Sequence, residues 1–301
     1  MTTPPRDQAR LGIVLGVAAY SFWGVIPLYW RLLHGIDPIE IVAHRIVWGL
    51  ATFVALAAAM GAWPAVIRAA RDRRAVRVLL LSSALLSANW SIFIYAVSSD
   101  HVLHASLGYF INPLVSVLLG MVVLGERLRR LQWVAVALAA AGVVQITLGA
   151  GGLPWIAVAL ALTFGGYGLL RKVAPVDALA GSTVETALVA PVAAGYLVYL
   201  AATGRGVLGH AEALPVFLVA LTGLVTAVPL VWFTAAARRV PLSTLGLLQY
   251  LAPTGQLFIG VLIFREPFDV HRLAAFACIW AGLAVFSADL LLFQRARAVA
   301  P

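Results

Sequence analysis

The chain repeats itself at one constant offset along the sequence, and residue types that seldom recur by chance keep this repeat register. The matched pairs are Asp37 with Asp177, Pro113 with Pro253, Gly120 with Gly260, Glu126 with Glu266 and Gly142 with Gly282. Five hydrophobic stretches fit into each copy. Because five is odd, the second copy must cross a membrane in the opposite sense to the first. This inverted duplication is common among secondary transporters.

The composition excludes an ordinary soluble fold. Hydrophobic residues make up 62% of the sequence and charged residues only 11%. A helix needs roughly 20 apolar residues to cross the hydrocarbon layer, and we expect such helices at 11–30, 41–61, 78–98, 102–124, 131–148, 154–170, 182–202, 214–236, 242–264 and 271–293. The sequence therefore predicts an all-α integral membrane protein with ten transmembrane helices. Its parts are a cytoplasmic tail (1–10), a first repeat (11–149), a second repeat (150–293) and a second cytoplasmic tail (294–301).

The distribution of arginine and lysine predicts the orientation. Sixteen of these residues fall in the tails and in the loops on the side of the N-terminus, whereas four fall in loops on the other side. Positive charge collects in cytoplasmic loops, so both termini are expected in the cytoplasm and the chain in a bacterial inner membrane. The same loops account for the net charge of +9, and no nucleic-acid partner is expected. The expected partners are a small-molecule substrate and the lipid bilayer.

The paired prolines indicate where a substrate would bind. Pro113 and Pro253 lie near the middle of the fourth and ninth expected spans, and each frees the carbonyl four residues earlier, at Tyr109 and Gln249. A freed carbonyl is tolerated in a membrane only where protein or a watery cavity satisfies it. We expect hinges at both prolines and a central cavity flanked by Asn112 and Tyr250, although prolines also bend helices simply for packing.

Two charged residues in the expected spans have a functional and a structural interpretation. Arg45 is a candidate for binding a substrate carboxylate or a nearby acid, or it extends to the membrane interface. Glu185 occupies the matching position of the second copy. It is the candidate for proton coupling, because burial favours the protonated form of a carboxyl group; the alternative is an anchor paired with a loop arginine. The two are expected at opposite ends of the membrane and not as partners.

Polar and aromatic residues supply the remaining candidates. Asn89 and Trp90 are answered in the second copy by Pro229 and Leu230, and such divergence suits substrate binding. Asn89 has an alternative role in a hydrogen bond between helices. An aromatic pocket for an amphipathic solute is expected from Trp23, Tyr167 and Trp232, whereas Trp30 fits an interfacial belt.

Other functional classes lack support in the residues. Cys278 is the only cysteine, no metal site or cofactor is expected, and no nucleotide-binding loop of the G-x-x-x-x-G-K-[ST] type occurs. We expect no enzyme, since no set of nucleophile, base or metal ligands converges. The alternatives that stay open are a membrane scaffold or sensor and an intramembrane lipid-linked transferase. The substrate, direction of transport, coupling ion and oligomeric state are not readable from the sequence.

Several longer stretches are similar to one known family. They are S-F-W-G-V-I-P-L-Y-W-R-L-L (21–33), E-I-V-A-H-R-I-V-W (40–48), A-S-L-G-Y-F-I-N-P-L (105–114), L-G-E-R-L (124–128), Y-G-L-L-R-K-V-A-P (167–175) and L-S-T-L-G-L-L-Q-Y-L-A-P-T (242–254). Nearly end to end, the chain resembles the RarD branch of the EamA-type drug/metabolite transporters. The resemblance implies a ten-helix carrier with two five-helix EamA repeats that exports amino acids, metabolites or drugs. Members of that branch have been described as chloramphenicol-related, but nothing in these residues points to that compound. We expect alternating access, either proton-linked or by exchange.

Overall fold

The computed structural model describes residues 6–99, 101–149, 155–210, 212–265 and 270–299, and every regular element in this part of the chain is a helix. The helices are α1 (Arg6–Val25), α2 (Pro27–Leu32), α3 (Pro38–Ala59), α4 (Trp63–Arg71), α5 (Arg73–Ser98), α6 (Val102–Leu124), α7 (Arg130–Gly149), α8 (Trp155–Val173), α9 (Ala178–Ala202), α10 (Val207–His210), α11 (Ala213–Ala237), α12 (Leu242–Leu248), α13 (Leu251–Phe258), the π-helix η1 (Ile259–Ile263) and α14 (Val270–Val299). Ten spans within them are long and apolar enough to cross a membrane. The all-α prediction with ten transmembrane helices is confirmed.

The helix boundaries follow the repeat register. Three helices of the first copy, α3, α5 and α7, begin at positions whose matches begin α9, α11 and α14 in the second copy. The matched aspartates explain one of these starts physically. Asp37 accepts backbone hydrogen bonds at the start of α3, and Asp177 accepts one from Ala180 at 2.8 Å at the start of α9. Each carboxylate therefore caps the second helix of its copy.

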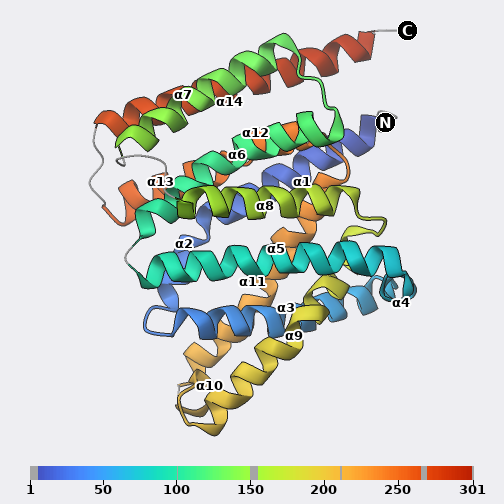
Figure 1. Ribbon diagram of the computed structural model, residues 1–301, viewed down its shortest axis with the longest axis vertical. Helices are drawn as coiled ribbons and strands as arrows, with labels where there is room; N and C mark the ends of the chain where they lie inside the picture. Colours follow the sequence, from blue (N-terminus) through green and yellow to red (C-terminus); the bar gives the residue numbers. More distant parts are fainter. Residues whose placement is uncertain (1–5, 100, 150–154, 211, 266–269, 300–301) are drawn as a thin grey trace.

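The packing between helices also recurs in the two copies. The first helix of one copy packs on the third helix of the other, since α1 contacts α11 and α8 contacts α5. The last helices, α7 and α14, lie side by side (Figure 1). In Figure 1, α1 begins and α14 ends at the same end of the bundle, as an even number of crossings requires. The inverted relation of the two halves itself stays a prediction from the odd number of spans in each.

Two matched glycines allow α7 and α14 to approach closely. A Cβ atom added at Gly142 would lie 2.6 Å from the carbonyl oxygen of Ala275, and one added at Gly282 would lie 2.7 Å from that of Ala135. The two contacts are equivalent, because Ala135 and Ala275 are themselves matched in the repeat register. Backbone contact through small residues is a common way to pack helices in a membrane, where no hydrophobic effect drives helices together.

The two matched prolines have different effects on their helices. The ninth span is interrupted, since α12 ends at Leu248, α13 begins at Leu251 and the π-helix follows. Pro253 frees the carbonyl of Gln249, which instead accepts a hydrogen bond from the amide three residues later, that of Ala252, at 3.1 Å. By contrast, α6 runs continuously through Pro113. The ninth span is therefore interrupted just before its proline, whereas the fourth span is continuous. A further interruption, at Ile26 before Pro27, separates α1 from α2.

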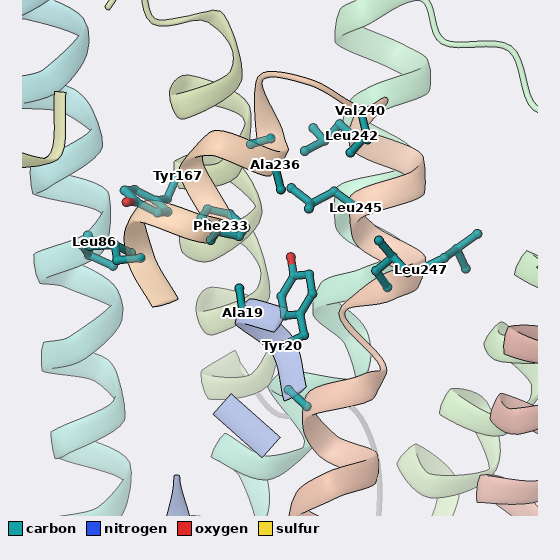
Figure 2. Packing of buried hydrophobic residues seen from close by; sticks show 14 of the residues in the cluster. Ala19, Tyr20, Leu86, Tyr167, Phe233, Ala236, Val240, Leu242, Leu245 and Leu247 are labelled. Atoms are coloured by element: carbon teal, nitrogen blue, oxygen red, sulfur yellow. The ribbon is translucent and has the colours of Figure 1, made fainter. Parts of the chain in front are cut away.

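An aromatic and aliphatic core lies where α1, α8, α11 and α12 meet. Figure 2 shows Tyr20 of α1 and Tyr167 of α8 on either side of Phe233 of α11, with Leu245 of α12 nearby. The rings of Tyr167 and Phe233 are stacked with centroids 5.9 Å apart, and those of Tyr20 and Phe233 meet edge-on at 6.1 Å. This core joins the two copies through the first helix of each.

Candidate functional site

A narrow cavity lies between α3, α5, α9 and α11, which are the second and third membrane helices of each copy. Its lining residues are Arg45, Ile46, Gly49, Phe53, Ser83, Leu86, Ser87, Trp90, Glu185, Thr186, Val189, Thr226 and Leu230. The cavity volume of about 20 Å³ is room for one or two water molecules. A larger solute can enter only if the four helices move apart.

The lining residues include five pairs that are matched in the repeat register. They are Arg45 with Glu185, Ile46 with Thr186, Gly49 with Val189, Leu86 with Thr226 and Trp90 with Leu230. Counterparts can line one small cavity only if the cavity lies on the junction that relates the two copies. The residue types differ within every pair, so the two halves of the cavity are chemically unequal.

Arg45 is held at one part of this cavity by a hydroxyl group and two aromatic rings. Its Nε donates a hydrogen bond to Oγ1 of Thr226 at 3.1 Å. Its guanidinium lies over the rings of Trp30 and Trp90, at 4.9 and 5.0 Å from the ring centroids. Such contacts stabilise a cation away from water. Among the described residues no carboxylate forms an ion pair with Arg45.

The local fold explains how these groups meet. The cap at Asp37 begins α3 two turns before Arg45. Pro27 begins the short helix α2, because proline is tolerated at the first helical position, and Trp30 lies on this helix. The ring of Trp30 contacts Arg45, a role that the interfacial interpretation of this residue did not include. Its place in an aromatic belt stays a prediction.

Glu185 lies at another part of the cavity in a buried network. Its Oε1 accepts a hydrogen bond from Oγ of Ser82 at 2.7 Å, and its Oε2 lies 3.7 Å from Nη1 of Arg171. Glu185 is 2% exposed and Arg171 is 1% exposed. Arg171 also donates to Oγ of Ser182 at 3.3 Å. Within the described part of the chain, neither Oε2 of Glu185 nor the nearby hydroxyl of Tyr167 makes a hydrogen bond of normal geometry.

The structural alternative for Glu185 describes its contacts, and the proton-coupling role stays a prediction. The expected pairing with an arginine is present, but Arg171 is buried in the last turn of α8 and not in a solvated loop. Arg45 and Glu185 form no ion pair with each other, as expected, yet they line the same cavity.

Asn89 contacts a neighbouring helix and not the cavity. Its Nδ2 donates to the carbonyl of Leu160 at 3.0 Å and to Oγ1 of Thr163 at 2.9 Å. The alternative interpretation, a hydrogen bond between helices, describes its contacts. The adjacent Trp90 does line the cavity.

The three aromatic candidates pack against other rings outside the cavity. Trp23 lies 5.7 Å from Phe233 between ring centroids, Tyr167 is stacked on the same ring, and Trp232 packs edge-on against Phe22 at 6.3 Å. None of the three lines the cavity between α3, α5, α9 and α11. The residues expected as an aromatic pocket therefore belong to packed contacts.

The fourth and ninth spans contribute structure beside the cavity. Tyr109 interacts electrostatically with Arg45 and is the one candidate of this group near a cavity residue. Asn112 and Gln249 are buried, and Oδ1 of Asn112 has no hydrogen-bond partner among the residues that the structure describes. Tyr250 donates to the carbonyl of Phe110 at 3.2 Å.

The two proline residues lie outside the cavity lining. Pro113 is part of a tight helix crossing, because a Cβ atom added at Gly246 of α12 would lie 2.7 Å from its carbonyl oxygen. The packing alternative therefore describes the surroundings of Pro113. The hinge role of Pro113 and Pro253 stays a prediction.

A second ionic network ties α12 to the loop after α6. The carboxylate of Glu126 accepts hydrogen bonds from the amides of Leu242 and Ser243, at 2.6 and 2.9 Å, and from Oγ of Ser243 at 2.7 Å. Nζ of Lys172 lies 4.0 Å from Glu126 and donates to the carbonyl of Ala237 at 3.2 Å. Glu126 thus caps a helix of the other copy instead of forming a purely local pair. Its counterpart, Glu266, lies outside the described residues.

Cations crowd this end of the bundle. Arg238, just after α11, has a pKa lowered first by burial and then by repulsion from Arg171. Its Nη1 lies 3.5 Å from the carbonyl of Ala174. Arg238 and Lys172 thus hold the ends of α8 and α11 together through backbone carbonyl groups.

Comparisons with known proteins identify the family of this chain. A family model described as the EamA-like transporter family matches residues 10–148. An uncharacterized transporter of Pseudomonas aeruginosa is 49% identical over 281 residues, which are 93% of this chain and 94% of that protein. The protein RarD of Streptomyces exfoliatus is 44% identical over 295 residues, covering 96% and 92%. The chain belongs to the RarD branch of the EamA-type transporters.

A solved crystal structure confirms the fold of this RarD-branch protein. It covers 92% of this chain and 97% of its own, with a TM-score of 0.71 at 20% sequence identity. The relatives and the ten apolar helices make the chain a multi-pass membrane transporter. Among the described residues no group of three or more His, Cys, Asp or Glu could hold a metal ion.

Sequence reasoning missed four residues of the RarD-branch site. They are Trp30, Ser82, Arg171 and Thr226. Arg171 is one of the sixteen arginine and lysine residues expected on the cytoplasmic side, and no periodic or repeat signal distinguishes a buried arginine from an exposed one. The missed signal for Thr226 is its match with Leu86 in the repeat register, since a hydroxyl replaces an apolar side chain at a matched position.

Proposed function

We propose that this protein is a secondary transporter that moves small amphipathic solutes across the bacterial inner membrane by alternating access. The observation that carries the proposal is the cavity at the junction of the two copies, lined by five matched pairs of residues. A binding site at the interface of two repeats is the arrangement that lets each repeat close one side of the membrane in turn. Relatives that are named as transporters support the same function.

The contacts at one end of the bundle supply a gate for such a cycle. Glu126 and Lys172 bind α12, α8 and the end of α11 together there. With the termini in the cytoplasm, as the charge distribution favours, this network closes the cytoplasmic side. Breaking it would let α8 and α12 separate and open the cavity toward the cytoplasm.

Glu185 provides a means of proton coupling. It faces the cavity, and the charged and titratable groups around it are Arg171 and Tyr167 from α8, with Arg45 across the cavity. Protonation of the carboxylate would end its attraction to Arg171. Because an uncompensated buried charge is unstable, Arg171 would then favour another position, and the contacts between α8 and α9 would change with the protonation state.

The test is flux through purified protein in liposomes. A tryptophan at Val189 would fill the cavity, whereas a tryptophan at Val192, one turn away on the same helix and 79% exposed, would face lipid. We expect counterflow of a screened solute with the wild type and Val192→Trp, and none with Val189→Trp. Equal flux through the two variants would contradict a route through this cavity. Covalent turnover of a lipid or the absence of all flux would support the transferase or the scaffold instead.

The coupling is tested by the pH dependence of the same flux. Wild-type counterflow should change with pH, and Glu185→Gln should remove that change while leaving the protein folded. The matched control is Glu212→Gln, a substitution of an exposed acid at the start of α11, which should retain the wild-type profile. An unchanged pH profile in Glu185→Gln would exclude Glu185 as the coupling group.

A further inference from the structure

We infer that the cavity selects small organic monocarboxylates and that Arg45 binds their carboxylate group. The inference rests on the proposed transport function and names the class of solute that is carried. Three observations support it: the open edge of the Arg45 guanidinium, the balance of charge in the cavity and the apolar character of the remaining walls.

The guanidinium of Arg45 is held by one hydrogen bond and two aromatic rings. Its Nε is bound to Thr226, and its central carbon lies over the rings of Trp30 and Trp90. In the described part of the chain the two terminal nitrogens make no hydrogen bond, and neither is fully enclosed. These two nitrogens form the planar fork that binds a carboxylate through two parallel hydrogen bonds. The protein thus holds the fork in place before the ligand arrives.

The charge in the cavity favours an anion. Arg45 and Glu185 are the two charged residues that line it, and Glu185 is already paired with Arg171 at 3.7 Å. One positive charge is therefore left without a partner among the described lining groups. Coulomb interactions are strong where water is scarce, so a monoanion gains attraction and an organic cation meets repulsion. A dianion would add an excess negative charge beside Glu185.

The rest of the cavity wall favours an apolar body. Apolar side chains supply most of it, namely Ile46, Phe53, Leu86, Val189 and Leu230, beside the hydroxyl groups of Ser83, Ser87 and Thr186. Burying a polar body against the apolar side chains would cost hydrogen bonds to water without replacement. A solute with a carboxylate at one end and a hydrocarbon or aromatic body therefore matches both parts of the cavity.

Three probes that share an apolar body separate the effect of charge from that of shape. Phenylacetate carries an anionic head group, phenylacetamide a neutral one and phenethylamine a cationic one. Binding to purified protein in detergent is measured by the ligand-induced increase in Tm and by calorimetry. We expect phenylacetate to bind at least about tenfold more tightly than the other two, as charge-assisted hydrogen bonds require.

Substitutions then assign the effect to Arg45. Arg45→Gln should weaken phenylacetate binding by about tenfold to a hundredfold, and Arg45→Lys by less, because lysine keeps the charge but lacks the fork. Thr226→Val removes the hydroxyl that accepts the hydrogen bond from Nε of Arg45 but keeps the charge of Arg45. This variant should also bind phenylacetate more weakly than the wild type. The control is Arg31→Gln, which removes an exposed arginine that lies over Phe264 outside the cavity; it should bind like the wild type.

Two results would overturn the inference. One is that the amide or the amine binds as tightly as the acid of the same length, measured for acids graded in length from acetate to octanoate. The other is equal binding by Arg45→Gln and Arg31→Gln. If some other solute still showed counterflow, the transport function would be retained and only the anion site would be rejected. Conversely, specific acid binding without any flux would overturn transport alone, so the two failures are distinguishable.

Discussion

The hydroxyl of Tyr250 donates a hydrogen bond to the carbonyl of Phe110, the residue that holds the same position in the other copy, at 3.2 Å. A residue can bond to its own counterpart only near the axis that relates the two copies. The cavity lies near the same axis, since Arg45 and Glu185 are counterparts and both line it. The axis of the predicted inverted repeat therefore lies near the bond between α6 and the interrupted ninth span and near the candidate site.

This bond predicts a modest loss of stability in Tyr250→Phe. The substitution keeps the ring and leaves the carbonyl of Phe110 without its donor, which should cost about 1 kcal/mol. Thermal unfolding in detergent measures the change. Tyr199→Phe serves as the control, because Tyr199 is exposed and should unfold like the wild type. An unaltered Tm for Tyr250→Phe would mean that the bond contributes nothing to stability.

The cap on α12 predicts a larger effect. The carboxylate of Glu126 accepts three hydrogen bonds from Leu242 and Ser243. Because Glu126→Gln removes its negative charge, the free energy of unfolding should fall by at least about 1.5 kcal/mol. Arg127→Gln, at the exposed neighbouring position, should change it little. If the two variants unfold at the same temperature, Glu126 is not the group that holds the two copies together at this end.

Close packing of α7 on α14 predicts intolerance of a single methyl group. Gly142→Ala places a Cβ atom where the carbonyl oxygen of Ala275 lies 2.6 Å away, and backbone atoms cannot turn aside as a side chain can. Overpacking of this kind costs about 1 to 3 kcal/mol. Gly149→Ala on the same helix meets nothing within 4 Å and should be neutral. Thermal stability and the retention volume of the detergent complex report both outcomes, and a stable Gly142→Ala would show that the helices can separate freely.

The sequence predicted the features that depend on repetition and hydropathy. The ten spans follow from the composition, and the repeat register pairs Asp37 with Asp177 and Gly142 with Gly282, whose contacts as helix caps and as packing glycines are seen in the structure. These features are local or periodic, so they are visible without knowing which helices touch. The pairing of Glu185 with an arginine was also among the stated alternatives.

The position of the cavity did not follow from the same signals. The prolines predicted a cavity beside the fourth and ninth spans, but the cavity lies between the second and third membrane helices of each copy. Proline in a helix indicates a break, and Pro113 shows that a break need not follow. The stronger signal was present in the matched pair Arg45 and Glu185. Its meaning depends on which helices pack together, and a helix that is apolar on all sides does not reveal its neighbours.

The buried pair of Glu185 and Arg171 predicts non-additive effects of substitution. Glu185→Gln would leave the guanidinium of Arg171 without its partner, and Arg171→Gln would leave the carboxylate of Glu185 alone; each change should cost about 3 to 5 kcal/mol. The double variant removes both buried charges, so its loss of unfolding free energy should be well below the sum of the two single losses. Thermal unfolding of all four proteins in one detergent completes the cycle. A double variant as unstable as additivity predicts would mean that the 3.7 Å contact is not an energetic pairing, and the coupling role of Glu185 would then have to act without Arg171.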